Sequence, residues 1–130
     1  MRFFFDNCIA PRISTSIAAL DHDHDVVHLS ERFARNTPDA FRISTLGNEG
    51  DWVIVSGDLR ISRSKAEREA WIESSLTVFF LASGWGQLKL WEIAWRLVKW
   101  WPLIVSQAHT VKPGAGFVIP VSGNRFQQLR

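Results

Sequence analysis

The chain has little cysteine and no long uncharged apolar segment. Only one of its 130 residues, Cys8, is a cysteine, so no internal disulfide can form. The most apolar stretch, residues 88–105, contains four charged side chains and a proline, whereas a membrane span needs roughly 18 apolar residues in succession. The first apolar run stops at Asp6, too early for the core of a secretory signal peptide. These absences lead us to expect a cytoplasmic protein with no membrane partner.

No internal repeat, low-complexity tract or linker divides the sequence. Its length, with 46% apolar and 22% charged residues, is typical of one globular domain, which we expect to cover residues 1–130. The net charge of +2 is unevenly spread, with nine acidic and five basic residues through Asp58 and four acidic and ten basic residues beyond it. The basic part could attract a phosphate backbone, although a single cation more simply solvates a helix face.

Continuous apolar runs alternate with segments of helical periodicity. Runs without polar alternation predict strands buried on both faces, and apolar spacings of three and four predict helices. The expected strands are residues 2–6, 25–29, 52–56, 77–81 and 116–120, and the expected helices are residues 12–20, 38 to 47 or 50, 65–74 and 87–107. This order predicts an α/β fold, a three-layer α/β/α sandwich with a mainly parallel central sheet.

Two of the expected strands end at a carboxylate. Asp6 follows the first strand directly, and Asp58 follows the third after Ser56 and Gly57. Parallel strands end at the same edge of a sheet, which is where α/β folds bind ligands, and two carboxylates there could hold a hard divalent cation. The alternatives are ordinary local structure, with Asp6 or Asn7 capping the next helix and Asp58 forming an Asx-turn.

A third acid and a basic cluster belong to the same hypothesis. Asp39 stands beside Pro38 in the first turn of a helix, where the helix dipole alone would favour a carboxylate. After Asp58 the cations crowd together, and on a loop that leads into a helix they could clamp phosphates with help from hydroxyl groups. The cations are Arg60, Arg63, Lys65 and Arg68, and the hydroxyl groups are those of Ser62 and Ser64, although Ser64 could instead only cap the helix.

Two further motifs have structural interpretations that we prefer. Residues 21–25 (DHDHD) contain groups that ligate transition metals, but the segment has the composition of an exposed turn. Cys8 could be activated by a helix N-terminus, but no histidine partner can be assigned to it, and a buried structural cysteine is the simpler interpretation.

The helix expected at residues 87–107 is rich in tryptophan. Its periodicity predicts a buried stripe of Trp91, Ala94, Trp95, Val98 and Trp101. Trp100 lies off that stripe, so we expect it to be exposed and, with Leu103 and Ile104, to offer a surface for a homodimer or another partner. Pro102 should kink or end the helix, because it removes a backbone donor.

The ordered set of motifs resembles the PIN-like domain family, small bacterial relatives of the VapC-type toxin ribonucleases. The matching segments are residues 3–7 (FFFDN), 37–39 (TPD), 50–58 (GDWVIVSGD), Ile61, Arg63, 67–71 (EREAW) and 76–81 (LTVFFL). The resemblance implies an α/β/α sandwich and an endoribonuclease that uses Mg²⁺ or Mn²⁺ to hydrolyse RNA. It also implies a toxin that is held in check by a protein antitoxin.

The resemblance also assigns roles to individual residues. Asp6, Asp39 and Asp58 take the positions of the catalytic, metal-binding acids. The side chains that it places against RNA are Asn7, Arg60, Ser62, Arg63 and Arg68.

One position departs from the family pattern, because Phe41 stands where a second helix acid is usual. A non-catalytic binding or regulatory module with a degraded metal site is therefore the alternative. A receiver-like phosphoryl-binding domain fits less well, because residues 81–83 (LAS) lack the lysine that such a domain needs after a late strand.

Overall fold

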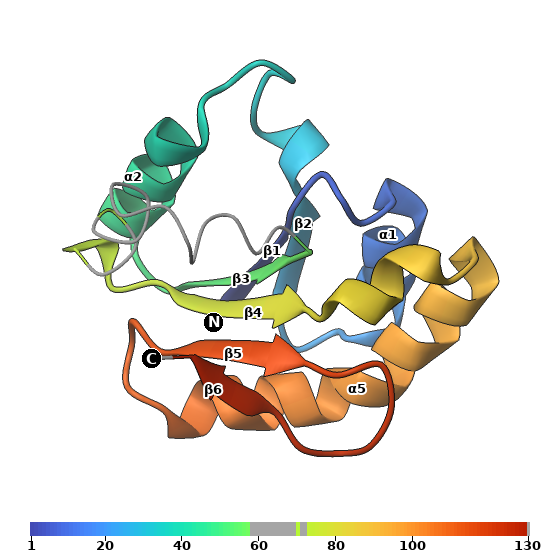
Figure 1. Ribbon diagram of the computed structural model, residues 1–130. Helices are drawn as coiled ribbons and strands as arrows, with labels where there is room; N and C mark the ends of the chain where they lie inside the picture. The colour runs from blue at the N-terminus through green and yellow to red at the C-terminus, as the bar shows by residue number, and fades with distance from the viewer. Residues whose placement is uncertain (58–69, 71–72, 130) are drawn as a thin grey trace.

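Six strands form one sheet at the centre of the molecule (Figure 1). The protein is described by a computed structural model over residues 1–57, 70 and 73–129. The strands are β1 (Arg2–Phe5), β2 (Asp25–His28), β3 (Trp52–Ser56), β4 (Thr77–Leu81), β5 (Gly116–Ile119) and β6 (Gln127–Leu129). All five strands that the sequence predicts are present, each within one residue of its expected ends.

The order of the strands is β2-β1-β3-β4-β5-β6, and only the last pair is antiparallel. In the parallel part, Phe5 is in register with His28 of β2 and with Val55 of β3. Because all of these strands run in the same direction, their carboxyl ends meet at one edge, as the α/β prediction requires.

Three α-helices lie in the described part of the chain: α1 (Pro11–Leu20), α2 (Asp39–Glu49) and α5 (Leu90–Thr110). Gly50 ends α2 with a positive φ of 76°, and Asp51 follows with a φ of 62°, a backbone turn that leads directly into β3. The helix expected at residues 65–74 lies largely outside the described residues. No helix of the described part has the length and apolarity needed to cross a lipid bilayer.

The helices cover both faces of the sheet and create two cores. On one face, α1 and α5 pack against alternate strand residues such as Phe3, Val55 and Phe79. On the other face, Ile43 and Leu46 of α2 pack against the intervening strand residues. The central strands are therefore buried on both sides, and the predicted three-layer sandwich is confirmed.

The tryptophan-rich helix turns a different face to the core from the predicted one. Trp91 is 83% exposed and Trp95 is 51% exposed, whereas Trp100 is 3% exposed. The buried stripe consists of Leu97, Trp100, Trp101, Ile104 and Ala108. Of the predicted stripe, Trp101 is buried as expected, but Trp91, Trp95 and Val98 are exposed. Both faces of α5 are apolar, so periodicity alone could not choose between them.

Aromatic contacts explain which face of α5 is buried. Trp101 stacks on Phe5 with ring centroids 5.7 Å apart, and Trp100 lies 5.0 Å from the ring of Phe126 near the C-terminus. Pro102 does not end the helix, which continues to Thr110. The predicted surface of Trp100, Leu103 and Ile104 is therefore wrong, since only Leu103 of the three is exposed.

Candidate active site

The ends of β1 and β3 bring a carboxylate and a hydroxyl together. Asp6 follows β1, and its backbone N–H donates to the carbonyl of Val55 in β3 at 3.0 Å. The next residue of β3, Ser56, is fully buried and donates from its hydroxyl to Asp6 Oδ2 at 2.8 Å. The Asp6 side chain is therefore held at the carboxyl edge of the sheet. Asp6 does not cap α1, whose N-cap position is Ala10.

Arg42 joins Asp6 to the second candidate acid. Its Nη1 atom lies 3.4 Å from Asp6 Oδ1, and its Nη2 atom forms an ion pair with Asp39 Oδ1. The three side chains are largely shielded, with exposed fractions of 13% for Asp6, 16% for Arg42 and 28% for Asp39. Two carboxylates from different elements therefore share one guanidinium.

The local structure of α2 explains why Asp39 and Arg42 meet. They lie three residues apart in its first turn, so they share one face of the helix, and Asp39 also complements the helix dipole. Both line a small cavity of about 30 Å³ between α2 and the sheet, together with Asp6 and Ile54. The site thus lies where the start of α2 crosses the carboxyl end of the sheet.

The remaining predicted site residues have different outcomes. Asn7 is exposed, and its backbone N–H donates to Asp6 Oδ1 at 2.7 Å. The third acid, Asp58, lies outside the described residues, and the chain is described up to Gly57 immediately before it. The predicted RNA contacts that also lie outside the described residues are Arg60, Ser62, Arg63 and Arg68.

Cys8 packs against the end of β3. As a whole residue it is exposed, contrary to the expected buried cysteine, but its sulfur accepts a hydrogen bond from the Gly57 N–H at 2.8 Å. A Cβ added at Gly57 would lie only 3.0 Å from this sulfur, so glycine permits the contact. Desolvation and the nearby Asp6 charge raise the pKa of the Cys8 thiol, which disfavours the reactive thiolate.

A buried histidine fixes the loop that follows Asp6. His28, at the end of β2, is 2% exposed. Its Nε2 donates to the carbonyl of Ile9 at 2.7 Å, and its Nδ1 accepts from the backbone N–H of Ser30 at 3.1 Å. With both ring nitrogens satisfied, His28 has a structural role.

Arg42 was not among the predicted site residues, although a signal for it is present in the sequence. A cation three residues after a helical aspartate is a standard ion-pair spacing. The neighbouring Phe41, which departs from the family pattern, has a side chain that is 60% exposed. Ser56, predicted as the last residue of the third strand, is the other residue whose contact with Asp6 was not predicted.

The chemistry of this edge suits a hard divalent cation. Asp6 and Asp39 offer carboxylate oxygens, and they already converge on one positive charge. Within residues 1–57, 70 and 73–129, no group of three or more potential ligands gathers around one point. Two acidic ligands are therefore available in the described part, and Arg42 competes with a metal ion for them.

Comparison with known proteins identifies a family for this chain. A family model described as a PIN-like domain matches residues 1–83, which contain β1 to β4 and all three candidate acids. No curated protein and no solved structure matches the chain. PIN-like domains are generally nucleases and typically use divalent metals. Because the match covers more than half of the sequence, the chain belongs to the PIN-like domain family.

Proposed function

We propose that this protein is a metal-dependent endoribonuclease and the toxin component of a toxin–antitoxin pair. The observation that supports the proposal best is the pairing of Asp6 and Asp39 with one guanidinium at the carboxyl edge of the sheet. Side chains from a strand end and a helix start are brought together there, as a site for a charged ligand requires.

In this proposal Asp6, Asp39 and Asp58 hold Mg²⁺ or Mn²⁺. Such an ion would supply a water molecule of lowered pKa and would offset charge on the scissile phosphate. Ser56 keeps the Asp6 carboxylate in place through the hydrogen bond to Oδ2. Arg42 offsets one of the two negative charges of Asp6 and Asp39, and its guanidinium could also bind a phosphate oxygen of the substrate.

RNA is the proposed substrate, with the backbone held by cations. Arg60, Arg63 and Arg68 supply the charge in the sequence, and Asn7 and Ser62 supply neutral polar contacts. Such contacts read the phosphate backbone, so they set affinity and register more than base preference.

A non-catalytic PIN-like module is the second candidate, and one observation favours it. Arg42 already pairs with both Asp6 and Asp39, so one of their two negative charges is offset without a metal ion. If that pairing is permanent, the fold could bind RNA or protein without cleaving either. The two candidates differ in whether a divalent ion displaces Arg42.

Cleavage of an RNA pool by the purified chain, in Mn²⁺ and in EDTA, tests the proposal. We expect cleavage only with the metal, and we expect Asp6→Asn and Asp58→Ala each to abolish it. Asp25→Asn is the control, because Asp25 is an exposed aspartate at the opposite end of the strands. Expression should arrest growth for the intact chain and not for Asp58→Ala. RNA that stays intact in Mn²⁺ would favour the non-catalytic module.

The proposed partners are a protein antitoxin and a second copy of the chain. The surface of α5 available to a homodimer consists of Trp91, Trp95, Val98 and Leu103, each at least 36% exposed. Sedimentation of the intact chain and of Trp91→Ser tests this, and a monomeric intact chain would exclude the homodimer.

A further inference from the structure

Two histidines from distant parts of the chain lie close together near the amino-terminal end of β2, whereas the acids lie at the carboxyl ends of the strands. His24 belongs to the turn between α1 and β2, and His109 lies in the last turn of α5. Their Nε2 atoms are 3.2 Å apart, although 85 residues separate them in the sequence. Asp6 follows the end of β1, whereas His24 precedes the start of β2, so the two places are well separated.

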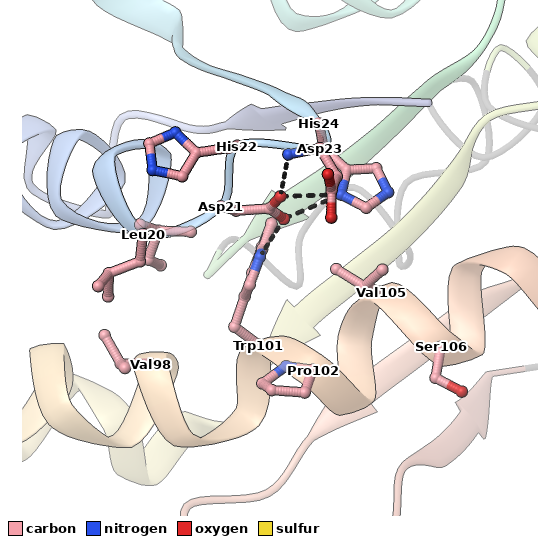
Figure 2. Close-up of a pocket in the computed structure, with 11 residues that line it drawn as sticks. Leu20, Asp21, His22, Asp23, His24, Val98, Trp101, Pro102, Val105 and Ser106 are labelled. Atoms are coloured by element: carbon pink, nitrogen blue, oxygen red, sulfur yellow. Dashed lines mark hydrogen bonds and ion pairs between the residues drawn. The ribbon is translucent and has the colours of Figure 1, made fainter.

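A carboxylate orients the first of these histidines. His24 Nδ1 lies 2.9 Å from Asp21 Oδ2 and 3.1 Å from Oδ1. Asp21 Oδ2 also accepts from the indole N–H of Trp101 at 2.8 Å, as Figure 2 shows.

This contact fixes which nitrogen of His24 can bind a ligand. With its proton on Nδ1 and donated to Asp21, His24 presents the lone pair of Nε2 to His109. A carboxylate behind a histidine is the usual support of a metal-binding imidazole, because it sets the ring orientation and raises ligand basicity. The prediction of a merely exposed turn was therefore wrong for Asp21 and His24, whose side chains are only 12% and 15% exposed.

The distance between the two nitrogens suits a shared ion. Two nitrogen ligands, each about 2.0–2.1 Å from a tetrahedral ion, are about 3.3–3.4 Å apart, close to the observed 3.2 Å. A direct His–His hydrogen bond is the alternative, but His109 is exposed and water could satisfy its nitrogen equally well.

We infer that His24 and His109 form a second metal site, for a transition-metal ion such as Zn²⁺, Ni²⁺ or Cu²⁺. Imidazole is a preferred ligand of these ions, in contrast to the carboxylates that suit Mg²⁺. No third histidine, cysteine or acid of the described residues completes the group, so water fills the remaining positions. His24 also lines a cavity of about 690 Å³ between the turn and α5, to which His109 does not contribute (Figure 2).

A metal ion at this site would connect the α1–β2 turn to the end of α5. Its role is therefore to stabilise the fold, and cleavage chemistry stays with the acids at the other edge. Since an ion that binds only the folded state raises stability, unfolding should become dependent on its concentration.

Calorimetry of the untagged intact chain with Ni²⁺ and with Zn²⁺ tests the inference. We expect one ion per chain, bound at least tenfold more weakly by His24→Gln and by His109→Gln. His22→Gln is the matched control, because His22 lies in the same turn, is exposed and has no drawn contact with Asp21 or His24 (Figure 2). Asp6→Asn should also leave Ni²⁺ binding unchanged, which separates this site from the proposed nuclease site.

Several outcomes would overturn the inference. No binding of either ion at millimolar concentration would leave only a His–His hydrogen bond. Equal loss of binding in His22→Gln would indicate non-specific chelation by the turn. If His24→Gln fails to fold, the exposed His109→Gln still decides the question, and Zn²⁺ should raise the unfolding midpoint of the intact chain but not of His109→Gln.

Discussion

Arg42→Ala is the substitution that distinguishes a metal site from a permanent ion-pair cluster. It removes the only cation that the described structure places on both Asp6 and Asp39. Without metal, two largely shielded carboxylates lose their counter-charge and repel each other, so the folded state should be less stable. With Mn²⁺, the same carboxylates should bind the ion without competition.

The size of both effects follows from the contacts. A hydrogen bond to a charged group contributes about 1.5–3 kcal/mol, and the contact with Asp6 is long at 3.4 Å, so we expect a destabilisation of about 1–3 kcal/mol. About 1.4 kcal/mol corresponds to a tenfold change in affinity, so Mn²⁺ should bind about 10- to 100-fold more tightly to Arg42→Ala.

Denaturant unfolding with and without Mn²⁺, together with calorimetry, measures both quantities. Arg12→Ala is the control, because Arg12 is exposed on α1, away from Asp6 and Asp39. Added Mn²⁺ should recover the stability lost in Arg42→Ala. Unchanged or weaker Mn²⁺ binding in this variant would refute the idea that Arg42 occupies the place of a metal ion.

Three further predictions concern the core, an ion pair and the thiol. Trp100→Ala should lower the free energy of unfolding by about 3–5 kcal/mol, and Trp91→Ala by less than about 0.5 kcal/mol, because only Trp100 is buried. Equal effects of the two substitutions in denaturant unfolding would contradict the face of α5 that is buried in the structure. Hydrogen bonds, first from Arg32, lower the pKa of Glu49 from 4.5 to about 2. The stability lost in Glu49→Gln should therefore be constant above about pH 5 and vanish as the pH falls to 2. We expect the loss to stay below about 1 kcal/mol, because the Arg32–Glu49 pair is one-third exposed. A stability difference between the two proteins that persists at pH 2 would argue against the pair. Cys8 should react with a thiol reagent mainly above pH 9, and rapid labelling at pH 7 would contradict its raised pKa.

The sheet could be predicted because its signal is local. Residues 3–5 and 52–55 are apolar without alternation, which is the pattern of strands buried on both faces, and they make up most of β1 and β3. The resemblance placed Asp39 in one site with Asp6, whereas the topology of parallel strands concerned Asp6 and Asp58. The position of Asp58 stays a prediction.

The contacts that were missed depend on tertiary structure. Trp101 belongs to both apolar faces of α5, and only its packing on Phe5 shows which face is buried. His109 has no local pattern that points to His24, because the fold alone brings these residues together. Arg42 is the exception, since its spacing from Asp39 could have been recognised in the sequence.

Anomalous scattering from a crystal of the intact chain grown with Mn²⁺ tests the central claim most directly. We predict a manganese peak bound by Asp6, Asp39 and Asp58, with the Arg42 guanidinium displaced from the two acids. An Arg42 that still pairs with Asp6 and Asp39, with no manganese between them, would contradict the proposed nuclease site.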